Sequence, residues 1–141
     1  MTSHTPRLVI IGGGNMGTAL VSGLVANGWE ASSITVVELD AGKRSSLEST
    51  FGVRTSATVV AGEGALIAVK PGDAAAVCAS AAALGIPRVL SIAAGISVAT
   101  LQDAAGARTT AVRAMPNTPA LVGAGVSAIC GSEQCTEADL A

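Results

Sequence analysis

The sequence predicts an α/β fold in which helices cover both faces of a doubly wound, mainly parallel sheet. Three observations predict this fold class. Apolar, β-branched segments alternate along the chain with segments whose apolar residues recur at helical spacing. The first apolar segment, Arg7–Ile11, has no polar alternation and therefore suits a strand buried on both faces. It runs directly into a glycine-rich turn that opens a helix, which is the third observation. The length of 141 residues bears on the number of domains, because it suits a single domain with its own core.

The strands are predicted from short apolar runs that end at turn residues. They span Arg7–Ile11, Ile34–Glu38, Ala65–Val69, Arg88–Ile92, Ala111–Met115 and Val126–Cys130. Residues 53–64 have a weaker pattern and are expected to hold a short additional strand and a truncated helix. Prolines at 71, 116 and 119 cannot continue a central strand, so they mark strand ends.

The helices are predicted from apolar spacing and from capping residues. They span Met16–Asn27, Asp40–Leu47, Asp73–Leu84 and Ser97–Gly106. Asp40, Asp73 and Ser97 are expected to cap the last three at their N-termini, because their side-chain oxygens accept hydrogen bonds from the first helical turn. Gly28 is expected to end the first helix.

The glycine-rich turn carries the strongest functional signal. Gly12-Gly13-Gly14-Asn15-Met16-Gly17 has the G-x-G-x-x-G spacing of a dinucleotide-binding turn. Gly12 permits a sharp turn, Gly14 lets phosphates approach the backbone, and Gly17 is expected to let the helix pack against the sheet. The helix that begins near Asn15 points unpaired N–H groups at an anion. We therefore predict a Rossmann-type domain that binds a pyrophosphate, with an ordinary structural turn as the alternative.

Composition excludes several other functions. A net charge of −2, one Trp, one Phe and no Tyr argue against a nucleic-acid partner. No apolar run approaches the roughly 20 residues of a membrane helix, and the N-terminus lacks the apolar core of a signal peptide, so we expect a cytoplasmic protein. The three cysteines have no metal-site or disulfide spacing, so no metal is expected.

An acidic residue about 20 residues past the glycine motif commonly binds the adenosine ribose in such folds. Glu38 occupies this position at the end of the second strand. A carboxylate there favours NADH, because the 2′-phosphate of NADPH would meet a like charge. Lys43 and Arg44 offer the alternative of meeting that phosphate, although a solvated helix start is the favoured interpretation of these two residues. NAD(P)H is the expected cofactor, with a preference toward NADH.

Three further loops follow strands of the predicted sheet, where ligands bind in open α/β folds. They are Lys70-Pro71, Ala93-Ala94-Gly95 and Pro116-Asn117-Thr118-Pro119. The first could be an ordinary strand-ending turn, and Gly95 of the second could equally be required for packing. The third holds an amide and a hydroxyl between two prolines, which suits the orientation of a ligand carboxylate or carboxamide, but it could also be a rigid connection.

Four segments in order resemble the cofactor domain of the pyrroline-5-carboxylate reductase family. They are Gly12–Gly17, Ala68-Val69-Lys70-Pro71, Ser91–Gly95 and Val112–Val122. The resemblance implies hydride transfer from NAD(P)H to the C=N carbon of 1-pyrroline-5-carboxylate, which gives L-proline. An iminium carbon is already electrophilic, so neither a nucleophile nor a metal is needed.

The resemblance also implies roles for residues of this chain. The pyrophosphate would lie on Gly12–Gly17, and Glu38 would occupy the ribose position. The cofactor cleft would be lined by Ala68, Val69, Lys70, Pro71, Ala93, Ala94 and Gly95. The nicotinamide and substrate side would hold Met115, Pro116, Asn117 and Thr118. Catalytic residues are not identified in this chain, and the resemblance places them in a C-terminal helical domain, together with the substrate loop and the main dimer interface.

The expected domain organisation is a tail at residues 1–6, a dinucleotide-binding domain at 7–131 and a linker at 132–141. Thr136-Glu137-Ala138-Asp139 has the spacing of a helix-capping motif. It is expected to open a helix of the further domain, and a floppy acidic tail is the alternative. The complete protein is then expected to be a homo-oligomer.

Two other functional classes stay open. The chain departs from the family at Glu38-Leu39 and lacks an asparagine expected before Ala65, which would fit a non-catalytic NAD(P)-binding regulatory or interaction paralogue. A β-hydroxyacid dehydrogenase would share the cofactor fold, but the Met115–Pro119 segment argues against it.

Overall fold

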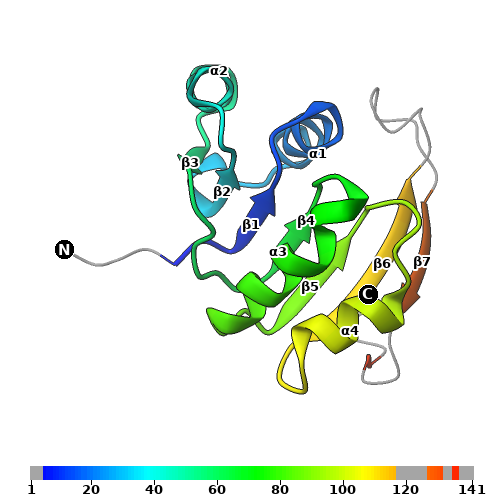
Figure 1. The fold of residues 1–141 in the computed structure, drawn as a ribbon. Helices are drawn as coiled ribbons and strands as arrows, with labels where there is room; N and C mark the ends of the chain where they lie inside the picture. Colours follow the sequence, from blue (N-terminus) through cyan, green and yellow to red (C-terminus); the bar gives the residue numbers. More distant parts are fainter. Residues whose placement is uncertain (1–4, 117–126, 132–134, 137–141) are drawn as a thin grey trace.

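A computed structural model describes residues 5–116, 127–131 and 135–136. Its centre is a seven-stranded sheet in the order β3-β2-β1-β4-β5-β6-β7 (Figure 1). The strands are β1 (Leu8–Ile11), β2 (Ile34–Val37), β3 (Arg54–Ser56), β4 (Ala65–Ile67), β5 (Arg88–Ser91), β6 (Thr110–Pro116) and β7 (Ser127–Gly131). Neighbouring strands are parallel except β6 and β7, which are antiparallel. The predicted fold class is confirmed.

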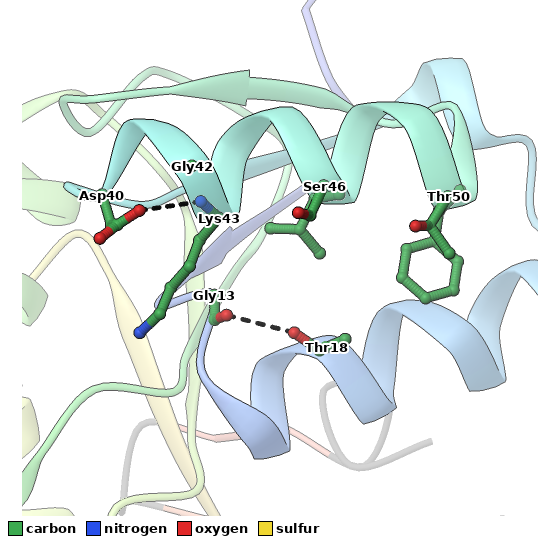
Figure 2. A pocket seen from close by; sticks show the side chains of 9 residues that line it. Gly13, Thr18, Asp40, Gly42, Lys43, Ser46 and Thr50 are labelled. Carbon is green, nitrogen blue, oxygen red and sulfur yellow. Dashed lines mark hydrogen bonds between the residues drawn. The ribbon is translucent and has the colours of Figure 1, made fainter.

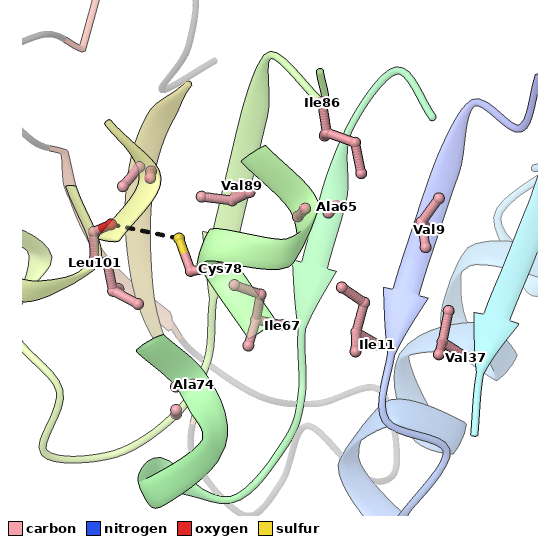
Figure 3. Close-up of a cluster of buried hydrophobic side chains, with 14 residues drawn as sticks. Val9, Ile11, Val37, Ala65, Ile67, Ala74, Cys78, Ile86, Val89 and Leu101 are labelled. Atoms are coloured by element: carbon pink, nitrogen blue, oxygen red, sulfur yellow. Dashed lines mark hydrogen bonds between the residues drawn. The ribbon is translucent and has the colours of Figure 1, made fainter. Parts of the chain in front are cut away.

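Helices form a layer on each face of the sheet (Figure 1). They are α1 (Asn15–Ala26), α2 (Ala41–Phe51), α3 (Pro71–Ala83) and α4 (Val98–Ala105), with a short 3-10 turn, η1, at Ala31–Ser33. Successive side chains of β1 point to opposite faces, as strand geometry requires. Ile10 joins the apolar cluster under α1 and α2, whereas Val9 and Ile11 join the cluster under α3 and α4 (Figure 3).

The strand order places a topological switch point between β1 and β4. From β1 the chain crosses to β2 on one side, whereas β4, the next neighbour of β1 in the sheet, continues to β5 on the other. All six parallel strands present their carboxyl ends at one edge. Open α/β sheets bind ligands at such a point because the two diverging crossovers leave a crevice there. The glycine turn follows β1 directly.

Three local predictions are wrong or incomplete. Asp73 does not cap α3: the helix begins two residues earlier, with Lys70 as its N-cap and Pro71 in its first turn. Proline has its φ already set for a first helical position and needs no N–H there, so it outweighs a capping carboxylate. The second helix continues past Leu47 to Phe51, and residues 57–64 contain no helix.

The caps at Asp40 and Ser97 are confirmed. Each side chain accepts a hydrogen bond from the backbone N–H three residues later, at Lys43 and Thr100 respectively. The predicted helix opening at Thr136 falls mostly on residues 137–141, which lie outside the described residues. In the described part of the chain, no helix is long and apolar enough to cross a membrane. No cluster of three potential metal ligands occurs there either.

Cys78 lies wholly inside the core between α3 and α4, and its thiol donates to the Leu101 carbonyl at 3.4 Å (Figure 3). Burial raises the pKa of this thiol, so less of the reactive thiolate is present near neutral pH. Cys135 is only half-buried. We expect iodoacetamide at pH 8 to label Cys135 in the folded protein and Cys78 only after unfolding, as read by peptide mass spectrometry. Equal labelling of the two in the native protein would contradict this placement of Cys78.

Candidate functional site

Gly12 turns the chain sharply at the end of β1. Its φ is +111°, and its N–H donates to the Val37 carbonyl at 2.8 Å. A Cβ built on Gly12 would lie 2.5 Å from the carbonyl oxygen of Ala68. Both the dihedral angle and the contact with backbone therefore require glycine. The close approach also explains how the loop after β4 comes to lie against the glycine turn.

Gly17 is required for a different reason from the one predicted. A Cβ on Gly17 would lie 2.0 Å from the carbonyl oxygen of Gly12, whereas its nearest approach to Ala68 is 3.7 Å. The missing side chain thus allows the first turn of α1 to close onto the glycine turn itself. Thr18 strengthens this closure, because its hydroxyl donates to the Gly13 carbonyl at 3.1 Å.

Gly14 is open where Gly12 and Gly17 are crowded. It is the N-cap of α1, it has extended backbone angles, and no side chain bonds the helix end. No described heavy atom lies within 4 Å of a Cβ built on it. The first intrahelical bond runs from the Thr18 N–H to the Gly14 carbonyl, so the N–H groups of residues 15–17 have no partner within the helix. This end of the helix can receive an anion.

Two adjoining hollows lie beside this helix end. One, of about 520 Å³, lies between α1 and α2 and is lined by Gly13, Thr18, Asp40, Gly42, Lys43, Ser46, Leu47, Thr50 and Phe51 (Figure 2). The other, of about 790 Å³, follows α1 and is lined by Gly13, Gly14, Asn15, Thr18, Ala19, Ser22, Lys43 and Phe51. They share Gly13, Thr18, Lys43 and Phe51, so together they form one groove from the glycine turn along both helices.

Glu38 lies at the end of β2, half-buried against the glycine turn. Its Oε1 accepts from the Gly13 N–H at 3.2 Å and its Oε2 from the Asp40 N–H at 2.8 Å. A Cβ on Gly13 would meet the Glu38 side chain at 3.2 Å, so the second glycine of the motif gives the carboxylate room. The charge is therefore fixed beside the turn by two backbone donors before any ligand binds.

The two neighbouring cations point in different directions. Lys43 is exposed, lines both hollows, and extends from α2 toward the glycine turn (Figure 2). Arg44 is half-buried, and its Nη1 donates to the backbone carbonyls of Glu38 and Leu39 at 2.8 and 2.9 Å. The alternative of a plain solvated helix start thus fails for Arg44.

Of the remaining predicted residues, those that the structure describes in the loops after β4 and β5 and at the end of β6 lie at the same edge of the sheet but are not among the lining residues of this groove. The Ala68 N–H donates to the Ile11 carbonyl at 2.8 Å, which holds the Ala68–Pro71 loop beside the glycine turn. The Ala93–Gly95 loop follows β5, where the Ala93 N–H donates to Ser91 Oγ at 3.2 Å and Gly95 has a φ of +75°. Met115 and Pro116 end β6, where they pair with Ala128 and Ser127 of β7. Asn117 and Thr118 lie outside the described residues.

Sequence reasoning named Lys43 on α2 but missed the rest of the α2 wall of the groove. The wall comprises Lys43, Ser46, Leu47 and Thr50, which follow each other at helical spacing and share one face, together with Phe51. The helical spacing of these residues was the signal that could have revealed the wall. The face is mostly polar, however, so it does not stand out in the sequence as an amphipathic stripe. Thr18 was missed on α1 for the same reason.

The switch point, the glycine turn and the bare helix end together define a Rossmann-type α/β domain. A family model described as NADP oxidoreductase, coenzyme F420-dependent, matches residues 7–95. The chain belongs to this family.

Individual proteins similar to this chain give a more specific comparison than the family model. A pyrroline-5-carboxylate reductase from Vibrio alginolyticus is 38% identical, over 96% of this chain and 52% of its own length. The structure of a pyrroline-5-carboxylate reductase from Coxiella burnetii has a TM-score of 0.88 at 30% identity, covering 97% of this chain and 53% of that one. A reductive aminase from Aspergillus terreus, solved with NADPH, has a TM-score of 0.72 at 26% identity, over 97% of this chain and 50% of its own. The chain spans about half the length of the relatives that it matches.

Proposed function

We propose that this chain is the NAD(P)H-binding part of a pyrroline-5-carboxylate reductase. One observation carries the proposal. The N-terminus of α1 is uncapped and opens, through Gly14, onto a groove that also receives the side chain of Lys43. Oriented N–H groups, a helix dipole and a cation suit a pyrophosphate better than any neutral ligand. The family description names NADP, which supports a pyridine dinucleotide as the owner of that pyrophosphate.

The proposed reaction is the one that the relatives' name implies. A hydride passes from the nicotinamide to the C=N carbon of 1-pyrroline-5-carboxylate, the nitrogen keeps or gains its proton, and L-proline forms. The cofactor supplies the hydride, so the role of this domain is to place the ring. Gly12–Gly17 would hold the pyrophosphate, and Ala68–Pro71 and Ala93–Gly95 would border the cleft toward the ring. Met115–Thr118 would lie on the nicotinamide and substrate side.

We propose that substrate binding and catalysis also need residues beyond those in this chain. The chain corresponds to about half of each relative's length. We therefore expect the 141-residue chain to bind NAD(P)H weakly and to reduce 1-pyrroline-5-carboxylate poorly. The full-length gene product, which we expect to be a homo-oligomer, should form proline at the expense of NAD(P)H. Robust proline formation by the chain alone would contradict the division of labour proposed here. Cofactor binding without imine reduction by the full-length protein would instead identify a regulatory, non-catalytic relative.

The cofactor preference is proposed to lean toward NADH because of Glu38. Its carboxylate is fixed at the end of β2, where a ribose hydroxyl can donate to it and a 2′-phosphate would be repelled. Glu38→Gln removes the charge and keeps the shape. We expect NADH affinity to fall about tenfold and NADPH affinity to hold or rise. A hydrogen bond to a charged group contributes about 1.5–3 kcal/mol and one to a neutral group about 0.5–1.5 kcal/mol, and the difference of about 1–1.5 kcal/mol corresponds to roughly tenfold.

Isothermal titration calorimetry with each cofactor measures this shift. Glu63→Gln is the matched control, because Glu63 is exposed and its N–H pairs with Pro6 at the amino-terminal edge of β1. An unchanged ratio of NADH to NADPH affinity in Glu38→Gln, equal to that of the control, would refute the role of Glu38.

A further inference from the structure

Arg44 is bonded to the backbone of the turn that carries Glu38. Its Nη1 donates to the Glu38 carbonyl at 2.8 Å and to the Leu39 carbonyl at 2.9 Å. These two carbonyls directly follow β2 and belong to the connection to α2. Arg44 also belongs to the first turn of α2, where its own N–H donates to the Asp40 carbonyl at 3.0 Å. The side chain therefore joins the start of the helix to the end of the strand before it.

Glu38, Leu39 and Asp40 form the turn between β2 and α2, and two carboxylates also hold this turn in place. Glu38 accepts from the Gly13 and Asp40 N–H groups, and Asp40 Oδ1 accepts from the Lys43 N–H at 2.9 Å. Both the backbone and the side chain of Glu38 are thus held, the former by Arg44 and the latter by the glycine turn. A carboxylate that must read a ribose is useful only when its orientation is set before binding.

We propose that Arg44 is a positioning residue that holds Glu38 toward the ribose of NADH, and that it is not a ligand of the 2′-phosphate of NADPH. The inference rests on the proposed binding of NAD(P)H at this groove. Lys43 lines both hollows, whereas neither Arg44 nor Glu38 is among their lining residues. Glu38 nevertheless adjoins the groove, because its carboxylate accepts from the N–H of Gly13, which lines both hollows, whereas the guanidinium of Arg44 is bonded to the carbonyls of Glu38 and Leu39. For Arg44 to turn toward a phosphate, its Nη1 would have to leave two carbonyl oxygens. Lys43 can meet an anion without breaking any side-chain bond that the structure shows.

The two possible roles of Arg44 predict effects of opposite sign. Arg44→Met keeps the aliphatic stem and removes the donors. If Arg44 positions Glu38, NADH affinity falls about five- to tenfold, as the loss of about 1 kcal/mol or slightly more implies. NADPH affinity then falls less, because a loosened carboxylate repels its phosphate less. If Arg44 were a phosphate ligand, NADPH affinity would fall selectively.

The experiment is calorimetric titration of the unmodified chain, Arg44→Met and Lys43→Met with NADH and with NADPH. Lys43→Met makes the same change one residue earlier and is expected to weaken NADPH at least as much as NADH. A double-mutant cycle tests whether Arg44 acts through Glu38. In a Glu38→Gln background, Arg44→Met should change NADH affinity by less than about twofold, because the carboxylate that Arg44 positions is already absent. If Arg44→Met loses stability, Arg44→Lys provides a second variant. Its single donor group should recover part of the NADH affinity.

Three results would overturn the inference. One is a selective loss of NADPH affinity in Arg44→Met, and another is unchanged affinity for both cofactors. The third is an undiminished effect of Arg44→Met in the Glu38→Gln background. Failure of the unmodified chain to bind either cofactor is a different outcome, because it overturns the proposed function and the inference falls with it.

Discussion

Replacing Gly17 by alanine is expected to destabilise the folded chain by about 3 kcal/mol or more, which is at the upper end for overpacking. The added Cβ would lie 2.0 Å from the Gly12 carbonyl oxygen, and both groups belong to backbone that cannot move aside cheaply. Gly12 is itself held between Val37 and Ala68, so a shift there would disturb the junction of three strands. For a domain of this size, we expect the thermal midpoint to fall by about 10 °C.

Circular dichroism during heating measures this change. Gly23→Ala is the control, since Gly23 lies in the same helix and a Cβ built there meets no described atom within 4 Å. It should raise stability by up to about 1 kcal/mol, the helix-propensity difference between the two residues. A Gly17→Ala protein that unfolds at the temperature of the unmodified chain would show that the turn is not closed as described.

Replacing Gly14 by valine is expected to leave the fold intact and to abolish cofactor binding. The extended angles of Gly14 suit any residue, and its Cβ would point into open space, so stability should change by no more than about 1 kcal/mol. The isopropyl group would occupy the approach to the uncapped N–H groups of α1. We expect affinity for NADH and NADPH to fall at least about 100-fold, which corresponds to about 2.7 kcal/mol.

Gly23→Val gives the matched comparison by calorimetric titration, because it adds the same side chain to α1 away from the helix end. It should bind both cofactors as the unmodified chain does. If Gly14→Val kept the affinity of Gly23→Val, the phosphates would have to bind elsewhere. The contrast between positions 14 and 17 separates a glycine kept for the ligand from a glycine kept for the fold.

The sequence predicted the sheet, the glycine turn and the place of Glu38, because each depends on residues adjacent in the chain. Only the structure shows why position 17 requires glycine, because the atom that a side chain there would strike is the carbonyl oxygen of Gly12 rather than an atom of the sheet. The hydrogen bonds of Glu38 were also beyond prediction, because one donor is a backbone N–H from another element of the fold. Asp73 was predicted as an N-cap from its residue type alone. That prediction did not consider Pro71, two residues earlier, which favours the first turn of the helix.

Lys43 and Arg44 show most clearly which features of the site cannot be predicted from the sequence. Adjacent residues on a helix point about 100° apart, so one can face a groove while the other folds back on the turn. Nothing in the sequence decides which does so. The carbonyls that hold Arg44 are main-chain groups, which any residues at those positions would supply.

The most direct test of the central proposal is a two-dimensional 1H–15N titration of the labelled chain with NADPH and with NADH. If the N-terminus of α1 binds the diphosphate, the largest shifts should fall on the amides of residues 13–17, with smaller ones at 38–43 at the start of α2. Shifts confined to another edge of the sheet, or none at millimolar cofactor, would contradict the assignment of this groove.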